Sequence, residues 1–260
     1  MIQLSAVVIT FNEEKNIERC ILSLQGIVDE IVVVDSYSKD RTEAICAQYG
    51  VRFIQHPFAG HIQQKNWAIT QASSPYVLSL DADEALSEEL RQSILAVKKN
   101  WTAQGYTFNR LNNYCGQWIH HSGWYPDRKL RLWDSRLGQW AGANPHDRYE
   151  MQTGATIQHL KGDLLHYTAN SIKEHFDMLY KYADIGAKEL VRQGKGSSWI
   201  KLTLNPWFKF FKMYILKRGY KDGLYGLIIC SSTAWFTPCG SSAARRRTSS
   251  SAAPPAPSRR

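Results

Sequence analysis

Apolar and polar residues alternate in two ways along the first hundred residues of the chain. Short runs of valine, isoleucine and leucine have the composition of strands that are buried on both faces. Between these runs, apolar residues recur every three or four positions, which is the spacing of a helix with one apolar face. The runs occupy residues 4–10, 30–35, 51–55 and 76–80, and the helical patterns follow at 12–24, 38–47, 62–72 and 84–99. This order predicts an α/β fold with a mostly parallel sheet and helices on its faces.

Local signals predict where the first of these helices begins and where the second ends. Asn12 can cap the first helix, and Glu13 and Glu14 suit its first turn. Gly50 is placed to end the second helix. We therefore expect the chain to pass from the first strand into a helix at Asn12.

The pattern changes after Trp101. The region that follows is rich in tryptophan, tyrosine, asparagine, glycine and histidine, with strand-like pieces at 129–133 and 155–159. Helical spacing returns from Asn170 to Arg192, before a segment of aromatic residues and lysines. These changes divide the chain into residues 1–105, 106–168, 169–238 and 239–260.

The C-terminal part shows neither a clear membrane span nor a packed core. Residues 223–244 carry no charge, but serine, threonine, glycine and Pro238 interrupt them, which makes a poor spanning helix. Residues 239–260 are almost entirely serine, alanine, proline and arginine. This composition predicts a disordered tail, or a change of reading frame near Thr237, and we assign it no function.

The cysteines and the N-terminus favour a reducing compartment. The chain has 5 cysteines and no C-x-x-C pair, so we expect packing cysteines and no structural metal site. The N-terminus runs straight into the first strand without a basic segment, so we expect no signal peptide.

The formal net charge of +9 is unevenly distributed. Residues 1–194 hold 20 lysines and arginines against 22 acidic residues, whereas residues 195–222 hold 7 against 1. A nucleic-acid-binding domain would carry its basic residues across the globular part, so this distribution argues against that class and leaves it as a weaker third alternative. A nearly neutral domain with a basic, aromatic appendage instead suits an anionic membrane surface.

Three predicted strands end in polar residues that can bind a ligand. The first ends in Thr10-Phe-Asn-Glu13, the second in Asp35, and the fourth in Asp81-Ala-Asp83. In a parallel sheet these carboxyl ends lie side by side at the edge where ligands bind. Clustered carboxylates repel one another unless a cation compensates, which favours a divalent metal held through oxygen atoms. The alternatives are a solvated turn for the D-x-D triplet and a capping or turn role for Asp35.

With these motifs the chain resembles the inverting glycosyltransferases of family 2, which have the GT-A fold. The resemblance rests on VVITFNEEKNIERCILSL, EIVVVDSYSKDRT, QQKNWAI and YVLSLDADE. Further on, GWYPDRKLRLW and NPHDRYE resemble the β-glucosyltransferases that build the lipopolysaccharide core on inner-core heptose. The similarity covers about residues 3–230. It implies a nucleotide-sugar-binding half at 1–105, an acceptor-binding and catalytic half at 106–168, and a helical, membrane-associating region at 169–238.

The resemblance also implies roles for individual residues. The base and ribose of a UDP-sugar would lie against the end of the first strand, and Lys65 would lie near the diphosphate. Asp81 would contact the ribose or a metal-bound water, and Asp83 would ligate Mg²⁺ or Mn²⁺, which stabilises the departing UDP. The implied nucleotide-sugar-binding residues are Thr10, Asn12, Glu13, Asp35, Lys65 and Asp81.

An inverting reaction needs a base that takes the proton of the acceptor hydroxyl. The best candidate is Asp147 in NPHDRYE, where related sequences carry His-Glu. The alternative is that Asp147 forms an ion pair with Arg148 or Arg128, which leaves Glu150 as the rival base.

The later residues carry weaker signals. His166 follows an apolar run and is either a metal ligand or a structural histidine. Arg128 and Arg131 could bind phosphates of the acceptor, or could simply line a solvated strand edge. The aromatic and basic segment 199–221 suits a helix lying in the plane of a membrane, or a helix packed on the core.

Together these features predict a metal-dependent transferase that moves a hexose, with glucose the expected sugar, from a UDP-sugar to lipopolysaccharide core. We expect it in the cytoplasm, on the inner face of the inner membrane. One alternative is a sugar-phosphate nucleotidyltransferase, although the first strand lacks the glycine-rich loop that such enzymes need. The other is a membrane-bound scaffold with the same fold and no turnover.

Overall fold

The computed structural model describes residues 1–143, 146–192 and 199–250. Asn144 and Pro145 of the NPHDRYE motif, and residues 251–260 of the predicted tail, lie outside the described residues. The chain forms two compact units, which we call the sheet unit and the helical unit. The sheet unit comprises Met1–Asn112 and Pro126–Tyr167, and the helical unit comprises Asn113–Tyr125 and Thr168–Arg260.

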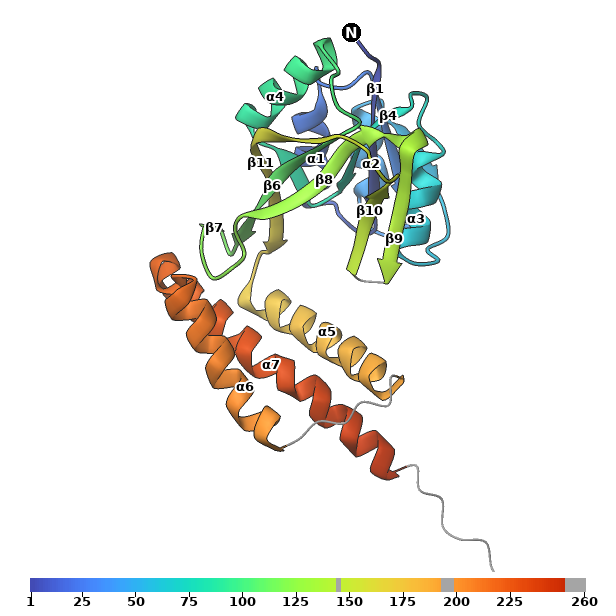
Figure 1. Cartoon of the computed structure of the whole chain (residues 1–260). Coiled ribbons are helices and arrows are strands. Elements are labelled where there is room, and N and C mark those ends of the chain that lie inside the picture. Colours follow the sequence, from blue (N-terminus) through green and yellow to red (C-terminus); the bar gives the residue numbers. More distant parts are fainter. Residues whose placement is uncertain (144–145, 193–198, 251–260) are drawn as a thin grey trace, which may run out of the picture. The chain divides into compact units, whose positions relative to one another are not determined.

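The sheet unit begins with the predicted alternation of strands and helices and continues with antiparallel strands (Figure 1). Its elements are β1 (Leu4–Thr10), α1 (Ile17–Leu24), β2 (Glu30–Asp35), α2 (Thr42–Gln48), β3 (Arg52–Gln55), α3 (His61–Ile69), β4 (Tyr76–Asp81), β5 (Glu84–Leu86), α4 (Glu88–Lys99), β6 (Gly105–Tyr114), β8 (Asp127–Asp134), β9 (Gly138–Ala143), β10 (His146–Met151) and β11 (Ile157–Ala169).

The main sheet has the strand order β3-β2-β1-β4-β8-β6-β11-β5. The pairs β3–β2, β2–β1 and β1–β4 are parallel, so that half of the sheet is as predicted. Strand β8 is antiparallel to β4 and β6, and β5 is antiparallel to β11, so the whole sheet is mixed. The expected α/β fold is confirmed, with β9 and β10 forming a separate hairpin.

Apolar residues cover both faces of the parallel strands. Val8 in β1 packs in one cluster with Ile17 and Ile21 of α1. Its neighbour Val7 packs on the other face in a cluster with Ala68 of α3. Because successive side chains of a strand point to opposite faces, a continuous apolar run buries both. This packing fixes the ends of β1, β2 and β4 at one edge of the sheet.

Two predicted helix starts are wrong. Helix α1 begins at Ile17, because Asn12 adopts a left-handed backbone (φ 55°) and its side-chain oxygen accepts from the backbone N–H of Lys39 at 2.8 Å. Glu84 opens the short strand β5, and α4 begins four residues later with Ser87 as its N-cap. Local propensity favoured helix at both places, but contacts distant in sequence decide the structure.

The helical unit contains β7 (Gln117–Ile119), α5 (Ile172–Arg192), α6 (Trp199–Phe211) and α7 (Gly223–Ser250). The buried Asp222 carboxylate accepts from the backbone N–H groups of His120 and His121, which holds the loop 120–125 against the start of α7. Helix α7 continues through residues 239–250, which belong to the segment with tail-like composition. In the described ranges, no helix has both the length and the apolar character that crossing a bilayer requires.

Candidate active site

The carboxyl ends of β1, β2 and β4 meet as the alternation predicted. Thr10 lies opposite Asp35 in the β1–β2 register, and Ile9 lies opposite Asp81 in the β1–β4 register. Asp35 is buried and accepts hydrogen bonds from the backbone N–H and the hydroxyl of Ser38, so its carboxylate supports the turn after β2. Among the described residues, the buried Thr10 hydroxyl has no hydrogen-bond partner, which leaves a polar group at this edge for a ligand.

Glu13 lies in the loop after β1, and its carboxyl group has a raised pKa. Burial raises its pKa to about 7, and the negative charges of Asp83 and Asp40 add to this effect. The side-chain amide of Asn16 donates to the Glu13 carboxylate at 2.8 Å and opposes the shift. Glu13 is therefore partly protonated near neutral pH and can both donate and accept hydrogen bonds.

The two predicted metal ligands lie together. His166 Nε2 is 3.2 Å from Asp83 Oδ2, and its other ring nitrogen is 2.7 Å from Asn112 Oδ1. When Nδ1–H donates to the amide oxygen of Asn112, Nε2 turns its lone pair toward the Asp83 carboxylate. Two electron-rich atoms at this distance need a proton or a cation between them.

Asp83 and His166 fit a site for a divalent metal ion that a bound substrate would also ligate. A histidine whose second nitrogen is fixed by a hydrogen bond is the usual oriented metal ligand. Over the described residues, no three histidine, cysteine or acidic side chains form a metal-binding group. Asp83 and His166 would therefore supply two ligands, and oxygens of a diphosphate would supply others, as is common for Mg²⁺.

Asp81 occupies a different environment from Asp83. Its carboxylate lies 3.1 Å from Lys65 Nζ and 3.0 Å from Arg131 Nη2. Burial favours the protonated form, but the charges of Lys65 and Arg131 outweigh it and hold the pKa of Asp81 well below its usual value. Two cations already neutralise Asp81, so Asp83 is the member of the D-x-D triplet that is free to bind a metal.

Glu84 and Arg131 form the buried base of this arrangement. Arg131 Nη2 lies 2.7 Å from Glu84 Oε1, and the second Glu84 oxygen accepts from the backbone N–H of Asp81 at 3.0 Å. Although burial works against its charge, Glu84 and Asp81 raise the pKa of Arg131 above its usual value. Arg131 is 3% exposed, so the alternative of a solvated strand edge is wrong: its guanidinium balances two buried carboxylates. Binding of an acceptor phosphate by Arg131 stays a prediction.

Replacing Arg131 by leucine is expected to lower the free energy of unfolding by about 3–5 kcal/mol, because Glu84 and Asp81 would lose the buried guanidinium that they share, and Arg110 lies 3.6 Å from Glu84. Urea denaturation of the purified variant measures this loss. Arg128, on the same strand, is exposed, and Arg128→Leu should change the value by less than about 0.5 kcal/mol. Equal stability of Arg131→Leu and the unmodified protein would show that the buried pairs do not hold this part of the sheet.

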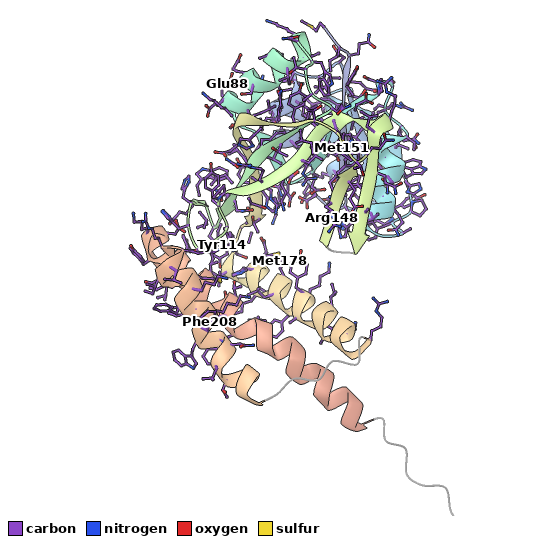
Figure 2. The ribbon with its side chains drawn as sticks, viewed as in Figure 1. Glu88, Tyr114, Arg148, Met151, Met178 and Phe208 are labelled. Carbon is purple, nitrogen blue, oxygen red and sulfur yellow. The ribbon has the colours of Figure 1, made fainter. Side chains whose placement is uncertain are left out.

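The candidate base is paired with a lysine. Asp147 Oδ2 lies 2.8 Å from Lys65 Nζ, so its partner is neither Arg148 nor Arg128, the two expected from local sequence. Arg148 instead pairs with Glu150 at 2.6 Å, and both of these side chains are exposed. Figure 2 marks Arg148 and Met151 along β10. Asp147 is half-buried beside Asp81, which places it closer to the strand ends than the rival base Glu150.

Several residues of the site were not predicted from the sequence. Glu84 follows the D-x-D triplet directly, and its position in an apolar strand was the available signal. Trp140 is buried, and its ring centroid lies 4.4 Å from Lys65 Nζ. No local pattern connects Trp140 or Asn112 with the strand ends, because both reach the site from the second half of the sheet unit.

Comparisons with known proteins agree with this architecture. The family model described as glycosyl transferase family 2 matches residues 5–154. An uncharacterized glycosyltransferase of Rickettsia felis is 30% identical over 88% of this chain and 84% of its own length. The lipopolysaccharide core biosynthesis glycosyltransferase LpsC of Rhizobium meliloti is also 30% identical, over 86% of this chain and 85% of its own length.

Among solved structures, the S. aureus protein TarS (residues 1–349) in complex with UDP is 16% identical, with a TM-score of 0.48 over 95% of this chain and 92% of that chain. The family model covers more than half of the chain, and its range includes every site residue described above except His166 on β11. The chain belongs to glycosyltransferase family 2.

Proposed function

We propose that this protein is an inverting glycosyltransferase that moves a hexose, expected to be glucose, from a UDP-sugar to a heptose of the lipopolysaccharide inner core. The observation that carries the proposal is the chain of contacts from Asp147 through Lys65 to Asp81, two residues from the Asp83–His166 pair. It joins a candidate base to a candidate diphosphate site. The similarity to LpsC supports the class of acceptor.

The donor would bind at the strand ends. The unpaired hydroxyl of Thr10 and the loop at Asn12 and Glu13 would contact the base and ribose, with Asp35 accepting from the uracil. Asp81 would contact the ribose, and Lys65 would place a positive charge near the diphosphate. Asp83 and His166 would hold Mg²⁺ or Mn²⁺, which when bound supplies a Lewis acid for the departing UDP.

Asp147 would act on the acceptor. As the acceptor oxygen forms its bond to the anomeric carbon, the bond from that carbon to the diphosphate oxygen breaks, and the hydroxyl proton passes to the Asp147 carboxylate. A single displacement of this kind inverts the anomeric configuration. Lys65 Nζ lies 2.8 Å from this carboxylate and would hold it in place during the reaction.

Arg128 would assist in binding a phosphorylated acceptor. Its side chain is exposed on β8, and a guanidinium can bind a phosphate through two parallel hydrogen bonds.

A membrane-facing surface would bring the enzyme to a lipid-linked acceptor. Helix α6 exposes Trp207 (66%) and Phe208 (68%), and Figure 2 marks Phe208 on this helix. Lys209 and Lys212 are interspersed with these aromatic residues. Exposed aromatics with lysines between them suit the interface of an anionic bilayer. The surface comprises Leu204, Trp207, Phe208, Phe211, Ile215, Leu216, Tyr220 and Leu224. We propose that it rests on the inner face of the inner membrane.

The double variant Trp207→Ser/Phe208→Ser is expected to bind vesicles containing anionic lipid at least about tenfold more weakly, because two large apolar side chains lose their place in the interface. Co-sedimentation with such vesicles measures the effect. Tyr180→Ser, which removes an exposed aromatic residue from α5, serves as the matched control and should bind as the unmodified protein does. Equal binding by the double variant would assign the membrane contact to another surface.

Mass analysis of lipopolysaccharide core tests the proposed function in cells. A strain lacking this protein is expected to produce a core that is lighter by one hexose, together with everything normally attached beyond it. Restoring the gene should restore the mass, and restoring it with Asp147→Asn should not. An unchanged core in the deletion strain would refute the proposed acceptor.

A further inference from the structure

Three consecutive side chains of α3 connect the parts of the site. Gln64 Nε2 donates to the hydroxyl of Ser36, just after β2, at 3.3 Å. Lys65 bridges Asp81 and Asp147, as described above. Asn66 makes two hydrogen bonds with the backbone of Trp140 in β9. The residues of the QKN triplet therefore contact the loop after β2, the end of β4 and the β9–β10 hairpin.

The contact made by Asn66 has the form of a clamp. Its side-chain amide donates to the carbonyl oxygen of Trp140 at 2.9 Å, and its side-chain oxygen accepts from the N–H of Trp140 at 2.9 Å. Both main-chain polar groups of one residue are thus satisfied by one side chain. Such a pair fixes both the distance and the orientation of the strand, because each bond requires alignment of donor and acceptor.

The clamp lies close to the candidate base along the hairpin. Trp140 is opposite Tyr149, and Asp147 is opposite Gly142, two residues further along β9. Residues two apart on a strand share a face, so Trp140, Gly142, Asp147 and Tyr149 lie on the same side of the hairpin. Helix α3 and β9 run beside each other (Figure 1). The clamp therefore lies between α3 and β9, and β9 pairs with β10, the strand that carries Asp147.

The hairpin depends on such contacts for its position. Strands β9 and β10 form a two-stranded sheet of their own, and an isolated hairpin is only marginally stable. Its aromatic residues pack on Trp133, with Tyr149 stacked at 3.8 Å and Trp140 edge-on at 5.6 Å between ring centroids. Apolar packing is not directional, so it favours burial of the hairpin more than one exact register. The two hydrogen bonds between Asn66 and the Trp140 backbone are directional, so they fix the position of β9 relative to α3.

We propose that Asn66 is a positioning residue for transfer: by clamping the backbone of Trp140 it sets the place of the hairpin that carries Asp147. This inference rests on the proposed role of Asp147 as the base. Within the described part of the chain the Asn66 side chain bonds the backbone of Trp140 and not the strand ends, so we expect its effect on donor binding to be small. A displacement of about 1 Å in a reacting group can cost about 10²-fold in rate.

The test compares Asn66→Ala and the isosteric Asn66→Asp with Gln63→Ala, an exposed position on the same helix. Asn66→Asp keeps the volume and the acceptor but loses the donor to Trp140. In both Asn66 variants we expect kcat for transfer from UDP-glucose, to core extracted from a strain lacking this protein, to fall about 30–100-fold. The dissociation constant of UDP in Mn²⁺ should stay within about twofold, and Gln63→Ala should match the unmodified protein in both measurements.

Hydrogen exchange gives a readout that needs no activity. Amides of residues 147–151 in β10 should exchange faster in both Asn66 variants, while those of β1 and β4 keep their protection. Transfer at the unmodified rate, loss of UDP binding in parallel with transfer, or unchanged exchange in β10 would each overturn the inference. If the unmodified protein transfers no hexose, the proposed function fails, and the exchange measurement still decides whether Asn66 clamps the hairpin.

Discussion

Replacing Asp147 by asparagine is expected to lower kcat for hexose transfer by about 10²–10⁴-fold, the range typical of a lost general base. The substitution keeps the size of the side chain and removes the group that takes the acceptor proton. The dissociation constant of UDP should change little by comparison, because Asp147 pairs with Lys65 and not directly with a strand end in the described ranges. Steady-state transfer assays and calorimetric UDP binding measure the two quantities.

Glu150→Gln is the matched control for this variant. Glu150 lies three residues further along β10, so its side chain points to the opposite face of the hairpin, where it is exposed and paired with Arg148. We expect its transfer rate to stay within about twofold of the unmodified protein, in line with a surface ion pair of small effect. If the transfer rate fell strongly in Glu150→Gln and only slightly in Asp147→Asn, Glu150 and not Asp147 would be the base.

Asp83→Ala is expected to abolish the dependence of UDP binding on Mn²⁺ and to lower transfer by at least about 10²-fold, since a catalytic metal contributes several kcal/mol to transition-state stabilisation. The variant removes the carboxylate that faces His166. Calorimetric titration of UDP with and without Mn²⁺ gives the binding effect directly.

Asp29→Asn provides the comparison for Asp83→Ala, because Asp29 precedes β2 at the opposite end of the strand and pairs with Lys98. It should keep the Mn²⁺ dependence unchanged. If Asp83→Ala bound UDP with the same metal dependence as the unmodified protein, the assignment of Asp83 as a metal ligand would be wrong.

The parallel half of the sheet and its ligand-binding edge could be predicted from the sequence. Strands such as EIVVVD are continuous apolar runs that end in a carboxylate, and the crossover helices between them impose a parallel order. Together these two local signals bring Asp35 and Asp81 to one edge, and the register confirms it. The separate environments of Asp81 and Asp83 do not follow from their spacing, because β4 ends at Asp81 and the chain turns before it reaches Asp83.

The rest of the site depends on pairings that local patterns do not encode. Strand β8 inserts beside β4, which brings Arg131 beneath Asp81, although the two residues are distant in sequence. The β9–β10 hairpin docks on α3 through Asn66, whose side chain gave no signal of a backbone partner. Asn12 is a residue type that favours helix N-caps, but hydrogen bonds to the loop after β2 hold it instead. For Asn12, two hydrogen bonds to residues distant in sequence outweigh a local preference for a helix cap.

Transfer by the purified protein tests the central claim most directly. The protein would be incubated with UDP-glucose, Mn²⁺ and core from a strain that lacks it, and the product linkage determined by NMR. We predict release of UDP together with one new hexose in β linkage, the inverse of the α configuration in the donor. Addition of the hexose in α linkage, or UDP binding without any hexose transfer, would contradict the account.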